Sequence, residues 1–115
     1  MTEFVETLVT RLAPMGSVRA KSMFGGYGIF KDELMFALVA NDIVHFKVDN
    51  DNRADFEAAD GEPFMYVKNG KAMPMSYWRV PTSTLEDDDA LLLWAHKGYE
   101  AALRKPRKKS KKARG

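Results

Sequence analysis

The sequence predicts a single α+β domain in which helices pack on an antiparallel sheet, in the order α-β-β-β-α-β-β-α. Three observations lead to this fold class. A chain of 115 residues has room for one domain, and an apolar fraction of 45% suits one globular core. The polar breaks between successive strands are too short for the crossover helix that parallel pairing needs. The domain is expected to cover residues 1–104.

The first part of the chain predicts one helix followed by three strands. Phe4, Leu8 and Leu12 recur at the spacing of one helix face, which indicates a helix over Thr2–Leu12. The segment Val18–Phe24 has extended character but weak patterning, and it is not counted among the strands. The three strands are expected at Tyr27–Lys31, Leu34–Ala40 and Ile43–Val48.

The second part predicts a short helix, a hairpin and a long final helix. Asp49, Asn50 and Asp51 are N-cap candidates for a helix that ends near Ala59. Asn69-Gly70 is a strong hairpin signal, because both residue types tolerate the positive φ angles of a type I′ turn. Pro74 indicates that the second hairpin strand is an edge strand or is bulged there. The hairpin strands are expected at Phe64–Lys68 and Lys71–Val80, and the final helix from about Ser83–Asp87 to Arg104.

The charge of the chain is divided between an acidic domain and a basic tail. Residues 105–115 carry seven of the 18 basic residues and no acidic one, which leaves 11 basic against 16 acidic residues in 1–104. We expect this tail to be disordered and to attract phosphate groups without reading bases. Its basic residues are Lys105, Arg107, Lys108, Lys109, Lys111, Lys112 and Arg114.

The composition also bounds the compartment. The chain has no cysteine and therefore neither disulfides nor thiolate metal ligands. Its N-terminal residues show no basic stretch followed by an apolar one, which a signal peptide would need. No apolar run approaches the roughly 20 residues of a membrane helix. We therefore expect a cytoplasmic protein that does not contact a membrane.

The sequence predicts no catalytic residue, no metal site and no cofactor. His45 and His96 have no second histidine at ligand spacing, so both are expected to be solvated or to pack. The acidic run at Asp49 fails as a calcium loop, because Arg53 and Ala54 stand where an oxygen ligand and a glycine are required.

Two segments are candidates for contact with a partner. In Gly25-Gly26-Tyr27-Gly28 the adjacent glycines favour a bulge or sharp bend, with a ligand or partner contact as the alternative. Met73, Met75 and Tyr77 share one face of the second hairpin strand and Trp78 lies on the other, so an apolar edge strand would allow a homodimer. The candidate contact residues are Met23, Phe24, Gly25, Gly26, Tyr27, Met73, Met75 and Tyr77.

Several short motifs occur in an order and spacing that cover nearly all of residues 1–104. They are Met23-Phe24-Gly25-Gly26-Tyr27-Gly28-Ile29-Phe30, Phe46-Lys47-Val48-Asp49, Pro63-Phe64-Met65-Tyr66, Met75-Ser76-Tyr77, Val80-Pro81 and Trp94-Ala95. On these motifs the chain resembles the N-terminal domain of the TfoX (Sxy) competence regulators. The resemblance implies helices on an antiparallel sheet and a bacterial intracellular protein with no established catalytic site. Full-length competence regulators carry a second, helical domain, so a lysine-rich tail in its place suggests a stand-alone member.

Two functional hypotheses follow. The first is a non-enzymatic regulatory or adaptor domain that acts through protein–protein contacts, with another protein or with itself. The second is a nucleic-acid-associated protein whose tail makes nonspecific phosphate contacts.

Overall fold

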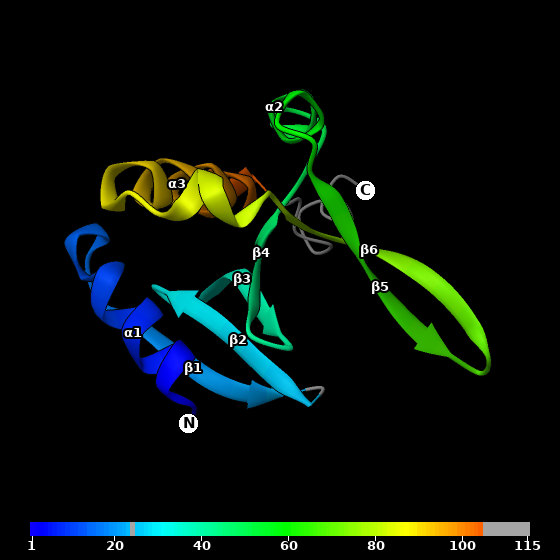
Figure 1. Ribbon diagram of the computed structural model, residues 1–115, viewed down its shortest axis with the longest axis horizontal. Coiled ribbons are helices and arrows are strands. Elements are labelled where there is room, and N and C mark those ends of the chain that lie inside the picture. The colour runs from blue at the N-terminus through cyan, green and yellow to red at the C-terminus, as the bar shows by residue number, and fades with distance from the viewer. Residues whose placement is uncertain (24, 105–115) are drawn as a thin grey trace, which may run out of the picture.

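The computed structural model describes residues 1–23 and 25–104. It confirms the α+β class, because helices pack on one antiparallel sheet (Figure 1). The helices are α1 (Glu3–Arg11), α2 (Arg53–Ala58) and α3 (Asp88–Arg104), with short 3-10 helices η1 (Ala13–Met15) and η2 (Thr82–Leu85). The strands are β1 (Val18–Met23), β2 (Gly26–Lys31), β3 (Leu34–Ala40), β4 (Ile43–Lys47), β5 (Glu62–Lys68) and β6 (Lys71–Arg79).

Over the residues that the structure describes, the sheet has six strands in the order β1-β2-β3-β4-β6-β5, one strand more than the sequence predicted. The additional strand is β1, at one edge of the sheet. Val18 and Ala20 pack against the core, while Arg19 and Lys21 are exposed. An edge strand that buries so few side chains has only a weak apolar alternation, so the sequence pattern does not predict it as a strand.

Three two-residue turns connect the strands of this sheet among the described residues. Asn69 and Gly70 have φ angles of 53° and 78°, which confirms the predicted hairpin turn. The Asp32-Glu33 and Asn41-Asp42 turns also have positive φ at both residues. The β2–β3 and β3–β4 hairpins are therefore as tight as the β5–β6 hairpin, which the sequence predicts from its Asn69-Gly70 turn.

The core lies between the sheet and α3, which crosses β3 and β4 (Figure 1). Phe36, Phe46 and Phe56 are fully buried, and the Phe56 ring meets Trp94 of α3 edge-on at 4.9 Å between centroids. Leu103, near the end of α3, is 54% exposed and lies outside this core. Within residues 1–23 and 25–104, no helix is long and apolar enough to cross a bilayer.

Buried Asn52 joins three elements. Its side-chain nitrogen donates to the carbonyl oxygens of Lys47 at 3.1 Å and Lys97 at 3.0 Å, and its side-chain oxygen accepts from the Asp49 amide at 2.8 Å. Asn52 is also the N-cap residue of α2, in place of the expected Asp49–Asp51. Asp49 instead closes the preceding turn, because its carboxylate accepts from the amides of Asp51 and Asn52. The start of α2 is thereby tied to β4 and α3.

Candidate protein-interaction surface

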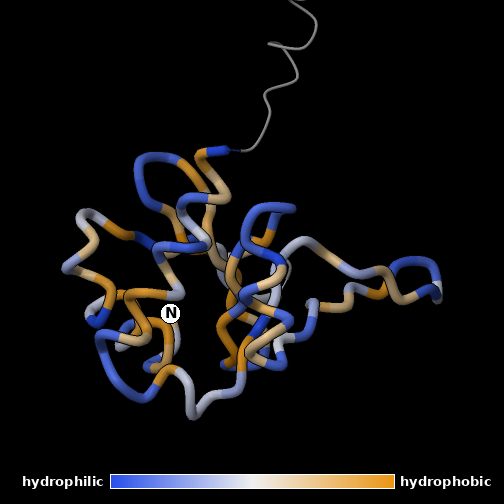
Figure 2. Tube along the Cα trace, turned by 90° about the horizontal axis from the view of Figure 1, so that it is seen from above, coloured by the Kyte–Doolittle hydropathy of each residue, from blue (hydrophilic) through white to orange (hydrophobic). Residues whose placement is uncertain are grey.

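The outer part of the β5–β6 hairpin extends beyond the rest of the sheet. The paired residues of β4 and β6 are Phe46 with Trp78 and Lys47 with Tyr77, and the Val48 amide donates to the Ser76 carbonyl at 2.9 Å. Among the described residues, β6 outward of Ser76 pairs with β5 alone. Figures 1 and 2 show the hairpin leaving the body of the molecule, and Figure 2 shows polar residues at its turn. We call residues 65–74 the arm.

The edge strand here is β5, not β6. The sequence expected Pro74 to mark either an edge strand or a bulge. For the first alternative, β6 as a whole lies between β4 and β5, but at Pro74 it pairs with β5 alone, as an edge strand does. The second is confirmed, because the β5–β6 register shifts between Pro63 and Met65, and Pro74 pairs with Met65 directly after the shift. Pro74 is tolerated in β6 because β4 does not reach this part of the strand.

Both faces of the arm are apolar. Met65 pairs with Pro74 and Val67 with Ala72, which places these four residues on one face, since side chains of directly opposed residues point to the same side. The opposite face carries Tyr66 with Met73. The exposed fractions are 46% for Met65, 37% for Tyr66, 64% for Val67 and 52% for Met73.

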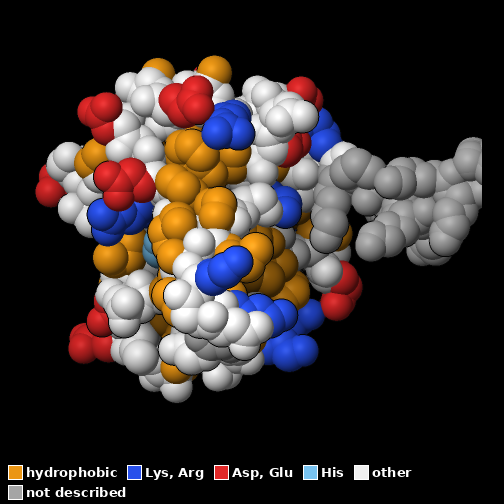
Figure 3. Space-filling model, turned by 90° about the vertical axis from the view of Figure 1, so that its right-hand side faces the viewer, with side chains coloured by type: hydrophobic (Ala, Val, Ile, Leu, Met, Phe, Trp, Pro, Cys, Tyr) orange, Lys and Arg blue, Asp and Glu red, His pale blue; other side chains and the backbone are white. Residues whose placement is uncertain are grey.

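The first face continues to a pocket at the base of the arm. The pocket has a volume of about 350 Å³ and includes Pro63, Met75 and Trp78 in its lining. The Arg53 guanidinium lies 5.4 Å from the centroid of the Trp78 ring at its rim. Figure 3 shows apolar side chains gathered in a band on the side of the molecule from which the arm projects. We call the residues of this face, from base to tip, the apolar stripe: Trp78, Pro63, Pro74, Met65, Ala72 and Val67.

The main chain of β5 is also open on its outer side. Residues that flank a two-residue hairpin turn exchange main-chain hydrogen bonds, and the bonding direction then alternates along the strand. Lys68 and Tyr66 therefore bond toward β6, while the amides and carbonyls of Val67 and Met65 point away from it. An isolated two-stranded ribbon is only marginally stable in water. Exposed apolar side chains on such a ribbon are typical of a surface that is covered by a partner.

Three of the sequence-predicted contact residues lie on β6. Met73 lies exposed on the arm, whereas Met75 and Tyr77 are half-buried at its base. The Tyr77 hydroxyl donates to the Met35 carbonyl at 3.4 Å, and burial raises the pKa of Tyr77. Tyr77 therefore fixes the base of the arm on β3, and Met73 is the most exposed of the three.

The glycine segment lies at the other end of the sheet order, and the structure does not bring it together with the arm. Gly25 has a φ angle of 75°, and a Cβ built on Gly26 would lie 2.1 Å from the Val39 carbonyl oxygen. Both observations support backbone freedom and close approach as the role of these glycines. Met23 is half-buried and Tyr27 packs against the core, while Phe24 lies outside the described residues.

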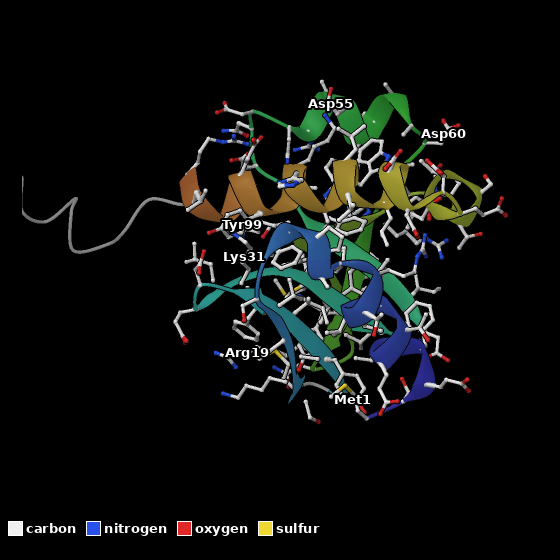
Figure 4. The ribbon with its side chains drawn as sticks, turned by 90° about the vertical axis from the view of Figure 1, so that its left-hand side faces the viewer. Met1, Arg19, Lys31, Asp55, Asp60 and Tyr99 are labelled. Carbon is white, nitrogen blue, oxygen red and sulfur yellow. The ribbon has the colours of Figure 1, made fainter. Side chains whose placement is uncertain are left out.

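Two clusters of titratable side chains attach α3 to neighbouring parts of the domain. The Tyr99 hydroxyl donates to Asp32 at 2.7 Å, and the Lys31 ammonium lies 4.2 Å from the centroid of the Tyr99 ring (Figure 4). The hydrogen bond from Tyr99, followed by that from Lys31, lowers the pKa of Asp32. At the end of α3, Arg104 donates to both carboxylate oxygens of Asp49 at 2.8 and 2.9 Å, which lowers the pKa of Asp49.

The histidines are separate from one another. His45 is buried with its Nδ1 3.4 Å from the Leu38 carbonyl oxygen and its ring edge-on to Phe64, and burial lowers its pKa. His96 is exposed on α3. Among residues 1–23 and 25–104, no group of three or more histidine or acidic side chains is placed to hold a metal ion.

A family model described as the TfoX N-terminal domain matches residues 10–102. The chain belongs to the TfoX N-terminal domain family. This confirms the family that the sequence motifs indicated. A curated relative, "DNA transformation protein TfoX1" of Aliivibrio fischeri (strain ATCC 700601 / ES114), is 30% identical over 93 residues. The match covers 81% of this chain and 44% of TfoX1, so the chain spans less than half the length of that relative.

The arm lies inside the matched part of this TfoX N-terminal domain, since residues 65–74 fall within 10–102. The basic residues of the predicted tail, Lys105 to Arg114, lie beyond the match and outside the described residues.

Proposed function

We propose that this TfoX N-terminal domain is a non-enzymatic regulatory domain of the cytoplasm that acts through protein–protein contacts, with the arm as its contact surface. The observation that carries the proposal is the arm itself, a ribbon beyond the sheet body with exposed apolar side chains on both faces. Protein interfaces typically have an apolar centre that is rich in methionine and aromatic side chains, with a polar rim around it.

The pocket at the base of the arm supports the same proposal. A partner side chain can enter the pocket between Pro63, Pro74 and Met75 and pack against the half-buried Trp78. Trp78 and Arg53 belong to the residue types that dominate the binding energy of interfaces. The stripe then offers further apolar contact from this anchor point to the tip.

The relative's name suggests a process in which to look for the partner. TfoX1 is described as a DNA transformation protein, and we extend regulation of DNA transformation to this chain as part of the proposal. It predicts that arm variants with native stability change the frequency of transformation in the source bacterium.

Site-specific photocrosslinking in the source bacterium tests the contact surface directly. A photoreactive amino acid at Val67 should give a discrete crosslinked product, because this side chain is 64% exposed on the arm. The matched control is Leu93, a 55% exposed apolar residue on α3, which should give none. Absence of any product from both Val67 and Met73 would overturn the proposal. The mass of the product separates self-association from a different partner.

A second candidate function rests on the seven basic residues between 105 and 115. Such a density of positive charge supports nonspecific contact with phosphate groups. The excess of acidic residues in 1–104 opposes contact elsewhere on the chain, so the tail would have to supply the affinity.

A further inference from the structure

We propose that two copies of this chain associate through their β5 edges, in an antiparallel two-fold register centred on Met65. The two six-stranded sheets then form one continuous sheet. This inference rests on the proposed function, because it names a second copy of the chain as the occupant of the arm.

The first step is the availability of the edge. β5 ends the sheet order, and the main-chain groups of Met65 and Val67 point away from β6. In the proposed register Met65 exchanges both main-chain hydrogen bonds with its own equivalent. The Val67 amide donates to the Pro63 carbonyl of the second copy, so the missing N–H of Pro63 removes only the outermost bond at each end.

The second step is charge complementarity, which selects this register. Centring on Met65 places Glu62 opposite Lys68 of the second copy at both ends of the paired strands, with apolar residues between them. A register shifted to centre on Tyr66 keeps the same faces but puts Lys68 opposite Phe64. Opposed opposite charges stabilise a strand pair, whereas an apolar side chain gives the ammonium no partner.

The tip of the arm also favours an incoming carboxylate. Lys68 and Lys71 are directly opposed in the β5–β6 pairing, and like charges in this position destabilise a strand pair. Glu62 already contacts Arg79 at 3.3 Å, but its side chain is 67% exposed and has room for a second cation. Each end of the interface therefore places the Glu62 carboxylate of one copy between Arg79 of its own chain and Lys68 of the other copy.

The third step is the fit of the apolar stripe. Val67 stands opposite Pro63 of the second copy and on the same face, one strand away from Trp78 of that copy. Val67, the most exposed of the large apolar side chains of the arm, is thus placed at the rim of the base pocket that Pro63 and Trp78 line. The arm of each copy therefore covers part of the apolar stripe that is exposed on the other copy.

Light scattering coupled to size exclusion, on the full chain over a range of concentrations, tests the pairing. The unaltered chain should give a dimer. K68E and E62K should each raise the dissociation constant at least tenfold, because each brings like charges together at both ends. An equimolar mixture of K68E and E62K should restore a dimer, since each carboxylate then faces an ammonium. K21E, with the same change in charge on the exposed face of β1, should remain as dimeric as the unaltered chain.

A chain that is monomeric at every concentration would overturn the inference, and so would a dimer that neither arm variant weakens. Two weakened variants that fail to restore each other would overturn the register. The inference and the proposed function can fail separately. A monomer in solution together with a crosslink from Val67 to a different protein rejects self-pairing and keeps the arm as a contact surface.

Discussion

Replacing Gly26 by alanine tests whether the glycine segment is required for strand packing. A Cβ at this position would lie 2.1 Å from the Val39 carbonyl oxygen and 3.2 Å from the Val39 carbonyl carbon. Ordinary carbon–oxygen contacts in sheets are about 3.3 Å or longer, so β2 and β3 must move apart by about 1 Å. The clash is with main chain, which cannot rotate away as a flexible side chain can.

The expected cost has two parts. Overpacking of a well-packed site costs about 1–3 kcal/mol, and loosening the Tyr27–Val39 pairing costs about 1 kcal/mol for a weakened hydrogen bond. We therefore expect Gly26→Ala to lower the free energy of unfolding by about 2–4 kcal/mol, a large share of the typical 5–15 kcal/mol. The melting temperature should fall by about 10–25 °C.

Urea unfolding followed by tryptophan fluorescence measures the difference, with Gly25→Ala as the matched control. Gly25 has a φ angle of 75° but no heavy atom within 4 Å of the added Cβ, so alanine there should cost only the backbone strain of about 1 kcal/mol. If Gly25→Ala destabilises the domain as much as Gly26→Ala does, the close approach to Val39 is not the reason that position 26 requires glycine.

Three further predictions concern other parts of the chain. Asn52→Ala should lower the free energy of unfolding by about 2–4 kcal/mol, because the buried Asn52 side chain loses three hydrogen bonds to half-buried partners; an effect below about 1 kcal/mol in urea unfolding would contradict this role. Stability should fall as the pH drops below the unfolded-state value of about 6.5 for histidine, because the folded pKa of His45 is lower and the unfolded chain takes up the proton first. His45→Gln should flatten the pH profile between 7.5 and about 5.5, and equal slopes for both proteins would exclude His45 as the cause. Removing residues 105–115 should leave stability nearly unchanged, and fluorescence anisotropy with labelled duplex DNA should detect weak, steeply salt-dependent binding by the full chain only; equal binding by both chains would reject the tail as its source.

The elements that the sequence predicted well carry their signal locally. The N-terminal helix has its apolar residues on one face and Thr2 as N-cap, whose hydroxyl accepts from the Val5 amide at 3.2 Å. The Asn69-Gly70 turn needs only its own two residues to be recognised. In both cases the physical cause of the structure lies within a few neighbouring positions.

The features that were missed depend on residues distant in sequence. Asn52 is one of several polar residues before α2, and its importance comes from the Lys97 carbonyl, which the fold brings to it from the last helix. The edge position of β5 follows from the insertion of β6 beside β4, which no pattern within the hairpin reveals. Of the candidate contact surface, the sequence predicts only the β6 residues Met73, Met75 and Tyr77. Met65 and Val67 are not predicted, because their exposure is set by how far β4 extends.

The position of α3 in the chain affects how the domain folds during its synthesis. The sheet face of β3 and β4 is closed by Asp88–Arg104, the last element described. Strands β1–β4 can pair as soon as they leave the ribosome, because tight turns join neighbouring strands. Their phenylalanines, Phe36 and Phe46, nevertheless stay open to water until translation has passed residue 104. The nascent chain therefore exposes apolar surface for most of its synthesis, an interval in which chaperones are expected to bind it.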